Sequence, residues 1–432
     1  TLKVHEASFT MSHHVDHQEQ QQQREEEERF LLEKTGLSSV VDLSLLTKLD
    51  LPGCNLTSLP SNLPNILPNL SILFCPKNNF EELPAIIGEC PKLQMVSFKD
   101  NGMKRIHPEA LQPQLRWLIL TGNAIEDIPE TIGRCEKLQK LMLSGNSLKT
   151  LPKSMDKLKR LELIRLACNN LQEPPLELLR LPNLRWVALS RNPFLDHIIA
   201  QRAAEPLKSL DDPVLVDTKW SILGQGAGGI TRKVEWNEVG FVAVKTFAGE
   251  LTSDGSPQDE RAISVAAASL EDPSLIRLLG QTSSNASLVM EFLDGYEALA
   301  GPPSMESCSR DVYSGNDDKK LSPNFAWSIV QNLFRVLQKL HVEKSICHGD
   351  FYAHNVLVSF KEQSVKLSDF GAAFFYDAKH EYGRLLQRIE LRAYSVLVEE
   401  LYALVVNDLS EDEIQRWKNL VAECSEANVT FD

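Results

Sequence analysis

The sequence predicts an α/β solenoid followed by a separate α+β domain. Between residues 46 and 197 one apolar pattern recurs every 22 to 24 residues. From Thr218 onward it gives way to a glycine-rich run, short β-prone runs (241–247 and 287–292) and helical patterns. The 432 residues suffice for two or three domains. We divide the chain into a disordered tail with an N-terminal cap helix (1–34), a solenoid of seven repeats (35–197), a linker (198–217) and the second domain (218–432).

Composition is that of an ordinary soluble protein, with 43% hydrophobic and 24% charged residues. A formal net charge of −14 argues against nucleic acid or an anionic membrane surface as the partner. No stretch approaches the roughly 18 apolar residues of a membrane span, and the N-terminus has no signal-peptide pattern. The eight cysteines form no CxxC pair, so we expect reduced thiols and a cytoplasmic protein.

The N-terminal segment 12–29 is polar, with Gln20 to Gln23 followed by Glu25 to Glu28. Such a run buries too little apolar area to offset the entropy of ordering, so we expect disorder or a frayed helix. A coiled-coil arm is the alternative, but apolar heptads are missing. The helix-prone stretch from Arg24 to Lys34 is predicted to cap the open end of the solenoid.

The repeated pattern is LxxLxLxxNxLxxL, and it predicts one short strand and one return segment per repeat. A single repeat cannot bury its apolar face, so stacked repeats share a continuous core. We expect the buried asparagine side chains to satisfy backbone groups along the turn. The asparagine position is filled in order by Cys54, Asn78, Asn101, Asn123, Asn146, Asn169 and Asn192. With Leu-Pro at 59–60, 83–84 and 151–152, the repeats resemble the intracellular Ras-group type of leucine-rich repeat, which implies a module for protein–protein recognition.

Large apolar side chains follow one face of the predicted solenoid sheet. Positions two, four and six before each asparagine should point away from the core, toward the concave face. This stripe is predicted to dock a protein substrate or regulator, or the chain's own second domain, because large exposed apolar patches usually bind something. The alternative is that the side chains only pack against one another across neighbouring strands. The predicted binding residues are Ile72, Phe74, Met95, Trp117, Ile119, Met142 and Trp186.

The second domain carries four motifs in a fixed order. Gly224, Gly226 and Gly229 form a GxGxxG-like run, which alone is weak evidence because dinucleotide-binding folds use it too. Lys245 ends the strand Val242–Lys245, where an ammonium group can reach phosphates. The remaining two motifs are His348-Gly349-Asp350 with Asn355, and Ser368-Asp369-Phe370-Gly371. Together they equip a site to move the terminal phosphoryl group of ATP.

These motifs resemble the protein kinase family over about 215 residues. The resemblance implies a two-lobed fold with ATP and Mg²⁺ as cofactors. The three glycines and Lys245 would bind the phosphates, and Glu260 is our candidate for the helix glutamate that pairs with the lysine. Glu291 to Leu293 would form the hinge beside the adenine.

The same resemblance assigns the reacting groups. Asp350 would be the base for the acceptor hydroxyl, while Asn355 and Asp369 would hold Mg²⁺. His348 is expected to be structural.

The second domain also departs from the protein kinase pattern. Gly349 replaces an arginine that grips a phosphorylated activation loop, and Tyr352 replaces a lysine that neutralises the transferring phosphate. Only 18 residues separate Gly371 from Glu390, which we place near the start of the central helix of the C-lobe. The C-lobe is therefore predicted to be truncated and its peptide groove curtailed. Residues 297–322 are predicted to be a mobile surface insertion.

Three functions remain open. The first is an active Ser/Thr or dual-specificity protein kinase whose solenoid recruits substrate, as in the soluble leucine-rich-repeat protein kinases of microbes and plants. The second is a catalytically weak pseudokinase scaffold, favoured by Tyr352 and the short C-lobe. The third is a small-molecule kinase resembling choline and aminoglycoside kinases, which share the His-Gly-Asp spelling.

Overall fold

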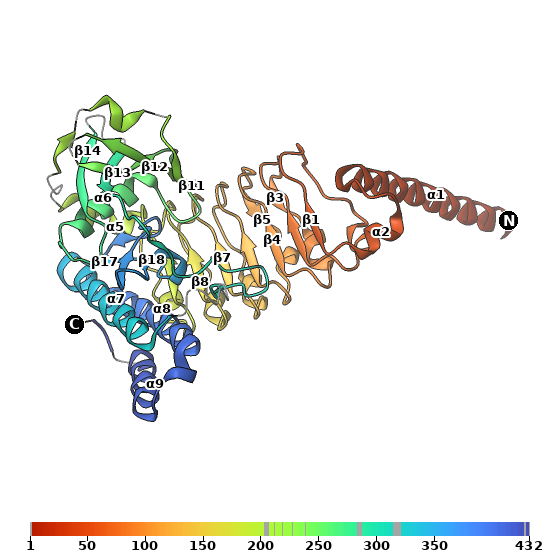
Figure 1. The fold of residues 1–432 in the computed structure, drawn as a ribbon. Helices are drawn as coiled ribbons and strands as arrows, with labels where there is room; N and C mark the ends of the chain where they lie inside the picture. The colour runs from red at the N-terminus through yellow and green to blue at the C-terminus, as the bar shows by residue number, and fades with distance from the viewer. Residues whose placement is uncertain are drawn as a thin grey trace.

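The computed structural model contains both predicted parts, joined end to end (Figure 1). It describes residues 2–202, 207–210, 212–217, 219–226, 228–237, 239–282, 287–313, 321–426 and 429–431, with side chains from residue 19 except those of Val216 and Ser425. Residues 314–320 of the predicted insertion lie outside the described residues.

The solenoid is built on a seven-stranded parallel sheet with one strand from each predicted repeat. Its strands, in spatial order, are β1 (Lys48–Asp50), β2 (Ile72–Phe74), β4 (Met95–Ser97), β6 (Trp117–Ile119), β7 (Lys140–Met142), β8 (Leu163–Arg165) and β9 (Trp186–Ala188). The return segments hold short helical turns and a two-stranded ladder: α2 (Val40–Leu45), α3 (Leu63–Ile66), β3 (Glu82–Leu83), η1 (Ala85–Glu89), β5 (Arg105–Ile106), η2 (Pro108–Ala110), η3 (Glu130–Arg134), η4 (Lys153–Lys157), α4 (Leu176–Leu179) and α5 (Pro193–Ala200).

The repeat asparagines bind the backbone, and they do so across repeats. Asn169 donates to the carbonyl oxygens of Leu143 (2.9 Å) and Leu166 (3.0 Å), while its Oδ1 accepts from the Leu148 N–H at 3.1 Å. Asn146 and Asn192 make the same contacts one repeat earlier and later. Each asparagine thus satisfies backbone groups of its own repeat and of the repeat before it.

The N-terminal segment is one helix, α1 (Leu2–Thr35). The polar run that we expected to be disordered or a frayed helix lies inside it. Its C-terminal end caps the solenoid: Leu31 is fully buried in the solenoid core. The Glu27 carboxylate accepts from the N–H groups of Ser61 (2.8 Å) and Asn62 (3.0 Å). Tertiary contacts therefore fix the end of a helix whose sequence alone predicts little stability.

The second domain has an N-terminal lobe with one mixed sheet and one helix, and a mainly helical C-terminal lobe. The sheet order is β10 (Ser209–Leu210), β14 (Leu278–Thr282), β15 (Ser287–Glu291), β13 (Gly240–Phe247), β12 (Gly229–Trp236) and β11 (Ile222–Gly226), and the helix is α6 (Pro257–Ala268). The second lobe contains β16 (Glu297–Ala298), α7 (Pro323–Lys344), β17 (Ile346–Cys347), η7 (Ala353–Asn355), β18 (Val356–Ser359), β19 (Ser364–Leu367), β20 (Phe374–Phe375), α8 (Glu381–Val405), η8 (Val406–Asp408) and α9 (Glu411–Ser425).

Two sequence-based boundaries were wrong. The predicted linker 198–217 contains β10, which pairs in parallel with β14, and the turn η5 (Pro213–Val216), so its second half belongs to the N-terminal lobe. Glu390 lies in the middle of α8 rather than near its start, because the helix already begins at Glu381. His380 accepts from the Tyr382 N–H and caps that start.

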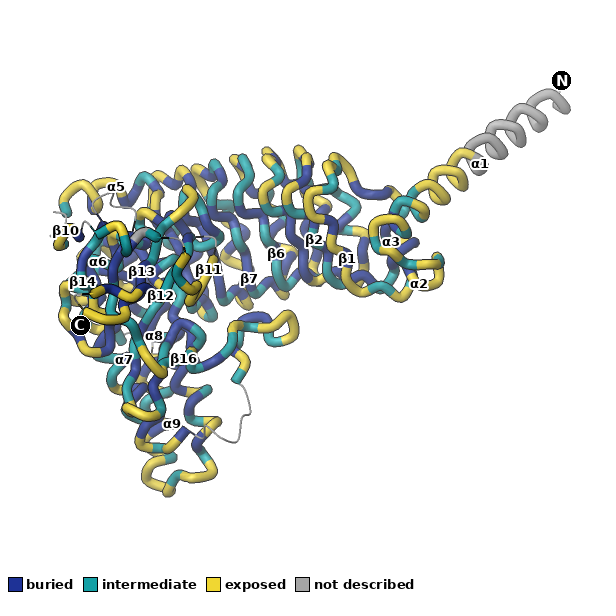
Figure 2. Tube along the Cα trace, turned by 45° about the horizontal axis from the view of Figure 1, so that its top comes forward, coloured by how far each residue is buried: buried dark blue, intermediate teal, exposed yellow. Residues whose placement is uncertain are grey.

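The two parts share hydrophobic cores. One core joins the solenoid leucines to Cys347, Phe374, Tyr376 and Leu386 of the second domain. A second core places Leu163 and Trp186 of the solenoid among the side chains of α7 and α8. Figure 2 shows buried residues continuing from the solenoid into the second domain. The join is therefore a permanent packed interface and not a flexible tether.

We predict that Asn169→Ala destabilises the protein by about 2–3 kcal/mol, because it leaves several buried backbone groups without partners. The neighbouring Asn170 is exposed, so Asn170→Ala is the matched control and should change the free energy of unfolding by less than about 0.5 kcal/mol. Urea denaturation measures both. Equal losses of unfolding free energy in the two variants would mean that the cross-repeat hydrogen bonds do not contribute to stability.

Candidate active site

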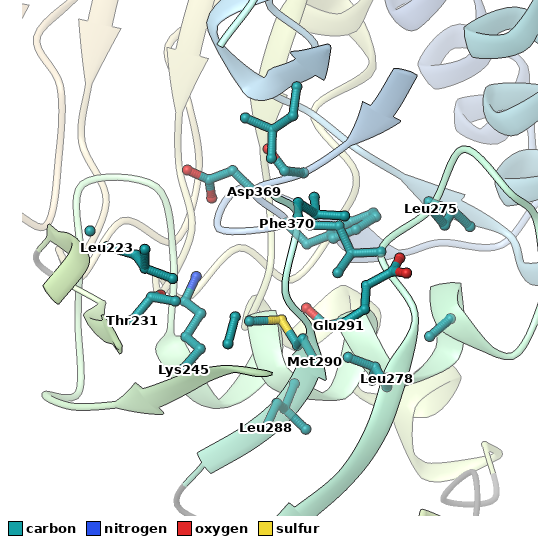
Figure 3. Close-up of a pocket in the computed structure, with 18 of the residues that line it drawn as sticks. Leu223, Thr231, Lys245, Leu275, Leu278, Leu288, Met290, Glu291, Asp369 and Phe370 are labelled. Carbon is teal, nitrogen blue, oxygen red and sulfur yellow. The ribbon is translucent and has the colours of Figure 1, made fainter. Parts of the chain in front are cut away.

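A cavity of about 430 Å³ lies between the two lobes of the second domain (Figure 3). Its apolar walls come from both lobes and suit a flat ring such as adenine. The predicted hinge residues Glu291 and Leu293 line it. The Glu291 side chain is engaged, since Lys366 Nζ binds Oε1 at 2.6 Å. The main lining residues are Leu223, Ala243, Leu275, Leu278, Leu288, Met290 and Phe370.

Lys245 and Glu260 form an ion pair at the wall of this cavity. Lys245 is on β13 and Glu260 is in the first turn of α6. Burial raises the pKa of Glu260, although the ammonium group of Lys245 opposes that shift. The structure thus joins the predicted lysine to the predicted helix glutamate.

The three predicted glycines border a tight hairpin between β11 and β12, in which Gly226 pairs with Gly229. Gly224 lines the cavity, and a side chain at Gly224 or Gly226 would meet no protein atom within 4 Å. Gly229 differs: its φ is +143°, and an added Cβ would lie 2.1 Å from the Thr246 oxygen. The first two glycines therefore leave open space, while the third allows β12 and β13 to approach closely.

Asp369 and Asn355 lie on adjoining segments. The exposed Asp369 carboxylate lines the cavity. The backbone N–H and the hydroxyl group of Ser368 both donate to the backbone oxygen of Asn355, at 2.9 and 2.7 Å, and so join the two segments. A carboxylate and an amide oxygen are hard ligands of the kind Mg²⁺ prefers, with phosphate oxygens and water completing its shell. The donor set fits the implied ion.

Asp350 is bound within its own loop, and a carboxylate from α8 holds the residues just before it. Asn355 Nδ2 donates to the Asp350 backbone oxygen (2.8 Å) and to Oδ2 (3.0 Å). The buried Glu390 accepts from the N–H groups of His348 (3.1 Å) and Gly349 (2.8 Å). Burial raises the pKa of Glu390, but His341 at 2.6 Å, His348 and the Gly349 N–H together lower the pKa more, so the net direction is downward. His348 Nε2 donates to the Ser368 backbone oxygen (3.1 Å), which fits its expected structural role.

Sequence reasoning missed Arg165, which reaches the site from the solenoid. It ends β8, and its guanidinium forms an ion pair with Asp350, donates to the Gly349 oxygen at 3.0 Å and binds Asp254 at 2.8 Å. Burial raises the pKa of Asp350, yet Arg165 and two histidines hold it below its usual value. No local motif marks this arginine, because its partners lie 89 to 185 residues away.

Both unusual residues of the catalytic loop face the solenoid. Tyr352 stacks on Trp186, with ring centroids 4.0 Å apart, and Trp186 Nε1 donates to the Phe351 oxygen at 2.9 Å. Gly349 has φ +72°, and its oxygen accepts from the Val187 N–H at 3.0 Å. An added Cβ at Gly349 would lie 2.3 Å from the Val187 oxygen. The solenoid therefore leaves no room for a side chain at Gly349 and provides a stacking surface for Tyr352.

The predicted concave stripe is divided between two environments. Trp186 is fully buried under the second domain, so the part of the prediction that offered it to a separate partner was wrong. Met142 packs against the same core, and Met95 is buried. Trp117 donates to Met142 Sδ at 3.4 Å, which is packing between neighbouring strands. Ile72, Phe74, Trp117 and Ile119 remain partly exposed.

The described part of the insertion 297–322 also contacts the solenoid. Arg310 and Ser309 both bind the Glu162 carboxylate, Arg310 at 2.8 Å. Asp311 binds His354 Nδ1 at 2.7 Å. Residues 309–311 are therefore not a mobile surface loop, because these contacts link them to the residue before β8 and to the catalytic loop.

The family models agree with this architecture. The model of the protein kinase domain matches residues 218–402, and that of the leucine-rich repeat matches residues 113–171. The chain is a leucine-rich-repeat protein with a protein kinase domain. In the part that the structure describes, no helix is long and apolar enough to cross a membrane.

Curated relatives match only part of this chain. The 2-5A-dependent ribonuclease of Homo sapiens is 29% identical over 155 residues, covering 36% of this chain and 19% of that protein. The tyrosine-protein kinase sid-3 of Caenorhabditis elegans is 26% identical over 184 residues, covering 40% of this chain and 14% of that protein. The match thus covers less than a fifth of each relative.

We predict that Trp186→Ala destabilises the kinase domain and the last repeats together, by about 3–5 kcal/mol, because it empties a core that both share. Trp117→Ala removes the equivalent, partly exposed side chain of the fourth strand and should cost clearly less. Calorimetry of the full chain measures both variants. Separate unfolding transitions, with only one shifted by Trp186→Ala, would contradict a shared core.

Proposed function

We propose that this chain is an ATP- and Mg²⁺-dependent protein kinase of Ser/Thr or dual specificity, with its leucine-rich repeats as the protein-recognition module. The observation that carries the proposal is the Lys245–Glu260 pair at one wall of the cavity, with the Asp369 carboxylate also lining it. Such a paired lysine and an acidic group are what a site needs to bind nucleotide phosphates and their metal.

The proposed roles follow the positions of the side chains. Lys245 binds ATP phosphates while Glu260 fixes its orientation, and the space before Gly224 and Gly226 admits the phosphate chain. Asp369 and Asn355 hold Mg²⁺, which neutralises phosphate charge when bound. Asp350 accepts the proton of the acceptor hydroxyl, whose oxygen forms a bond to the γ-phosphorus as the bond to the leaving ADP breaks.

Protein recognition is assigned to the free part of the concave face. Ile72 and Phe74 on β2, and Trp117 and Ile119 on β6, are partly exposed there and lie in register on the two strands that flank β4. Side chains of this kind anchor protein partners because they bury much area with little loss of conformational freedom.

Two other functions have specific support. Tyr352 has no positive charge and is buried against the solenoid, which favours a nucleotide-binding pseudokinase. The short segment between Gly371 and α8, together with the close solenoid, restricts a peptide groove and favours a small alcohol as acceptor. A phosphotransfer assay with Mg·ATP, on protein and small-alcohol acceptors, distinguishes the three. Transfer to neither acceptor would contradict the proposed kinase.

We predict that Asp350→Ala lowers the phosphotransfer rate by roughly 10³-fold or more but leaves ATP affinity nearly unchanged, since its role lies in the reacting complex. Single-turnover kinetics and nucleotide titration measure the two effects. Parallel losses of binding and turnover would identify Asp350 as a structural residue.

We also predict that ATP raises the melting temperature much more with Mg²⁺ than without it, through preferential binding to the folded state. Asp369→Asn should abolish the magnesium-dependent part. Asp377→Asn, beyond the cavity, is a control expected to retain it. An ATP effect indifferent to the metal would argue for the pseudokinase.

A further inference from the structure

Arg165 bridges three parts of the molecule with one side chain. Arg165 belongs to none of the kinase motifs. It is a concave-face residue of β8 in the solenoid. Asp254, which it binds, lies in the loop between β13 and α6 of the N-terminal lobe, whereas Asp350 and the Gly349 oxygen belong to the C-terminal lobe. Its side chain is only 2% exposed. A charge so buried is stable only when its hydrogen bonds are satisfied, and three acceptors satisfy it here.

The catalytic loop itself brings no lysine or arginine to this place. Residues 350–355 read Asp-Phe-Tyr-Ala-His-Asn. Tyr352 is buried against Trp186, and His354 is bound to Asp311 at 2.7 Å. Lys245 is paired with Glu260. Phosphoryl transfer brings further negative charge beside the Asp350 carboxylate, so a cation at this position would favour the reaction.

We propose that Arg165 of the solenoid is a positioning residue of the kinase active site, which orients the Asp350 carboxylate and supplies the positive charge that the catalytic loop lacks. The inference rests on the proposed phosphotransfer. It makes the last repeats part of the active site as well as a recognition module.

The alternative is that Arg165 inhibits the enzyme by occupying the Asp350 carboxylate. Two observations favour a contact that leaves Asp350 able to accept a proton. First, Arg165 binds Oδ1 and Asn355 binds Oδ2, and a carboxylate with about four lone-pair sites can accept a further hydroxyl. The Asp350 side chain is 18% exposed, so it is not sealed. Second, Leu163 and Trp186 lie in the hydrophobic core of the kinase domain. Removing the solenoid to release a block would expose that core.

The test compares Arg165→Met, Arg165→Lys and the control Arg180→Ala in the full chain. Methionine keeps the length without the charge, and lysine keeps a charge without the three-way geometry. Arg180 forms an exposed ion pair with Glu381 across the same interface, so its loss tests the interface alone. We expect Arg165→Met to lower kcat by about 10²–10³-fold with KM for ATP within about twofold, Arg165→Lys to restore part but not all of that loss, and Arg180→Ala to match the wild type.

Other outcomes overturn the proposal in distinguishable ways. A higher kcat in Arg165→Met identifies the arginine as a block, and an unchanged kcat identifies a contact without a role in turnover. Equal losses in the methionine and lysine variants, with lowered melting temperatures, identify a structural residue. If Arg165→Met does not fold, Arg165→Lys decides alone, since a kcat equal to the wild type overturns the proposal. Absence of phosphotransfer in the wild type instead contradicts the proposed function itself.

Discussion

Burial of the two open ends of the solenoid is the constraint on which the structure depends. Each repeat covers the apolar face of its neighbour, so the first and last repeats would expose leucines to water without a cover. At the N-terminal end Leu31 of α1 enters the core. At the other end α8 lies against α4 and β9, and its side chains join the solenoid core. The kinase domain is thus the C-terminal cap of the repeats, and its place is fixed by packing.

That packing accounts for the departures of the kinase domain from its family pattern. A glycine is required at position 349 because the backbone of β9 approaches it closely. An aromatic ring at position 352 finds a stacking partner in Trp186. Arg392 of α8 donates to the backbone oxygens of Leu181 and Leu184 at 2.9 and 2.7 Å, so the solenoid covers part of the C-lobe surface. Changes that look like losses of function in the sequence are explained locally as interface contacts.

Charge is arranged along the same seam. Arg165 bonds to Asp254 and Asp350, Arg191 to Asp259 at 2.9 Å, and Arg310 to Glu162 at 2.8 Å. The exposed pairs among them contribute little free energy, because water screens them. The buried contacts of Arg165 matter for orientation, because they fix Asp254 of the N-terminal lobe and Asp350 of the C-terminal lobe against β8. A concave face lined by both apolar and basic side chains is therefore suited to hold Tyr352 and the Asp350 carboxylate of the catalytic loop.

The sequence by itself determined the features that depend on short-range pattern. The repeat period gave seven strands in register, and motif order located Lys245, Glu260 and Asp369 around one cavity. These follow because each depends on residues within one strand, turn or helix. The full extent of α1, the position of β10 and the start of α8 were not predicted, since tertiary contacts and capping override weak local preference there.

Only the tertiary structure decided which parts of the chain meet at Asp350. Trp186 was predicted as a concave-face residue that docks either a protein partner or the second domain, but the sequence did not decide between them and did not single out Arg165. Their partners lie more than 160 residues away in the catalytic loop. Such contacts are selected by the shape and charge of two folded surfaces, which no periodic pattern or short motif encodes. The repeats and the kinase motifs could each be predicted alone, whereas their shared site required the folded chain.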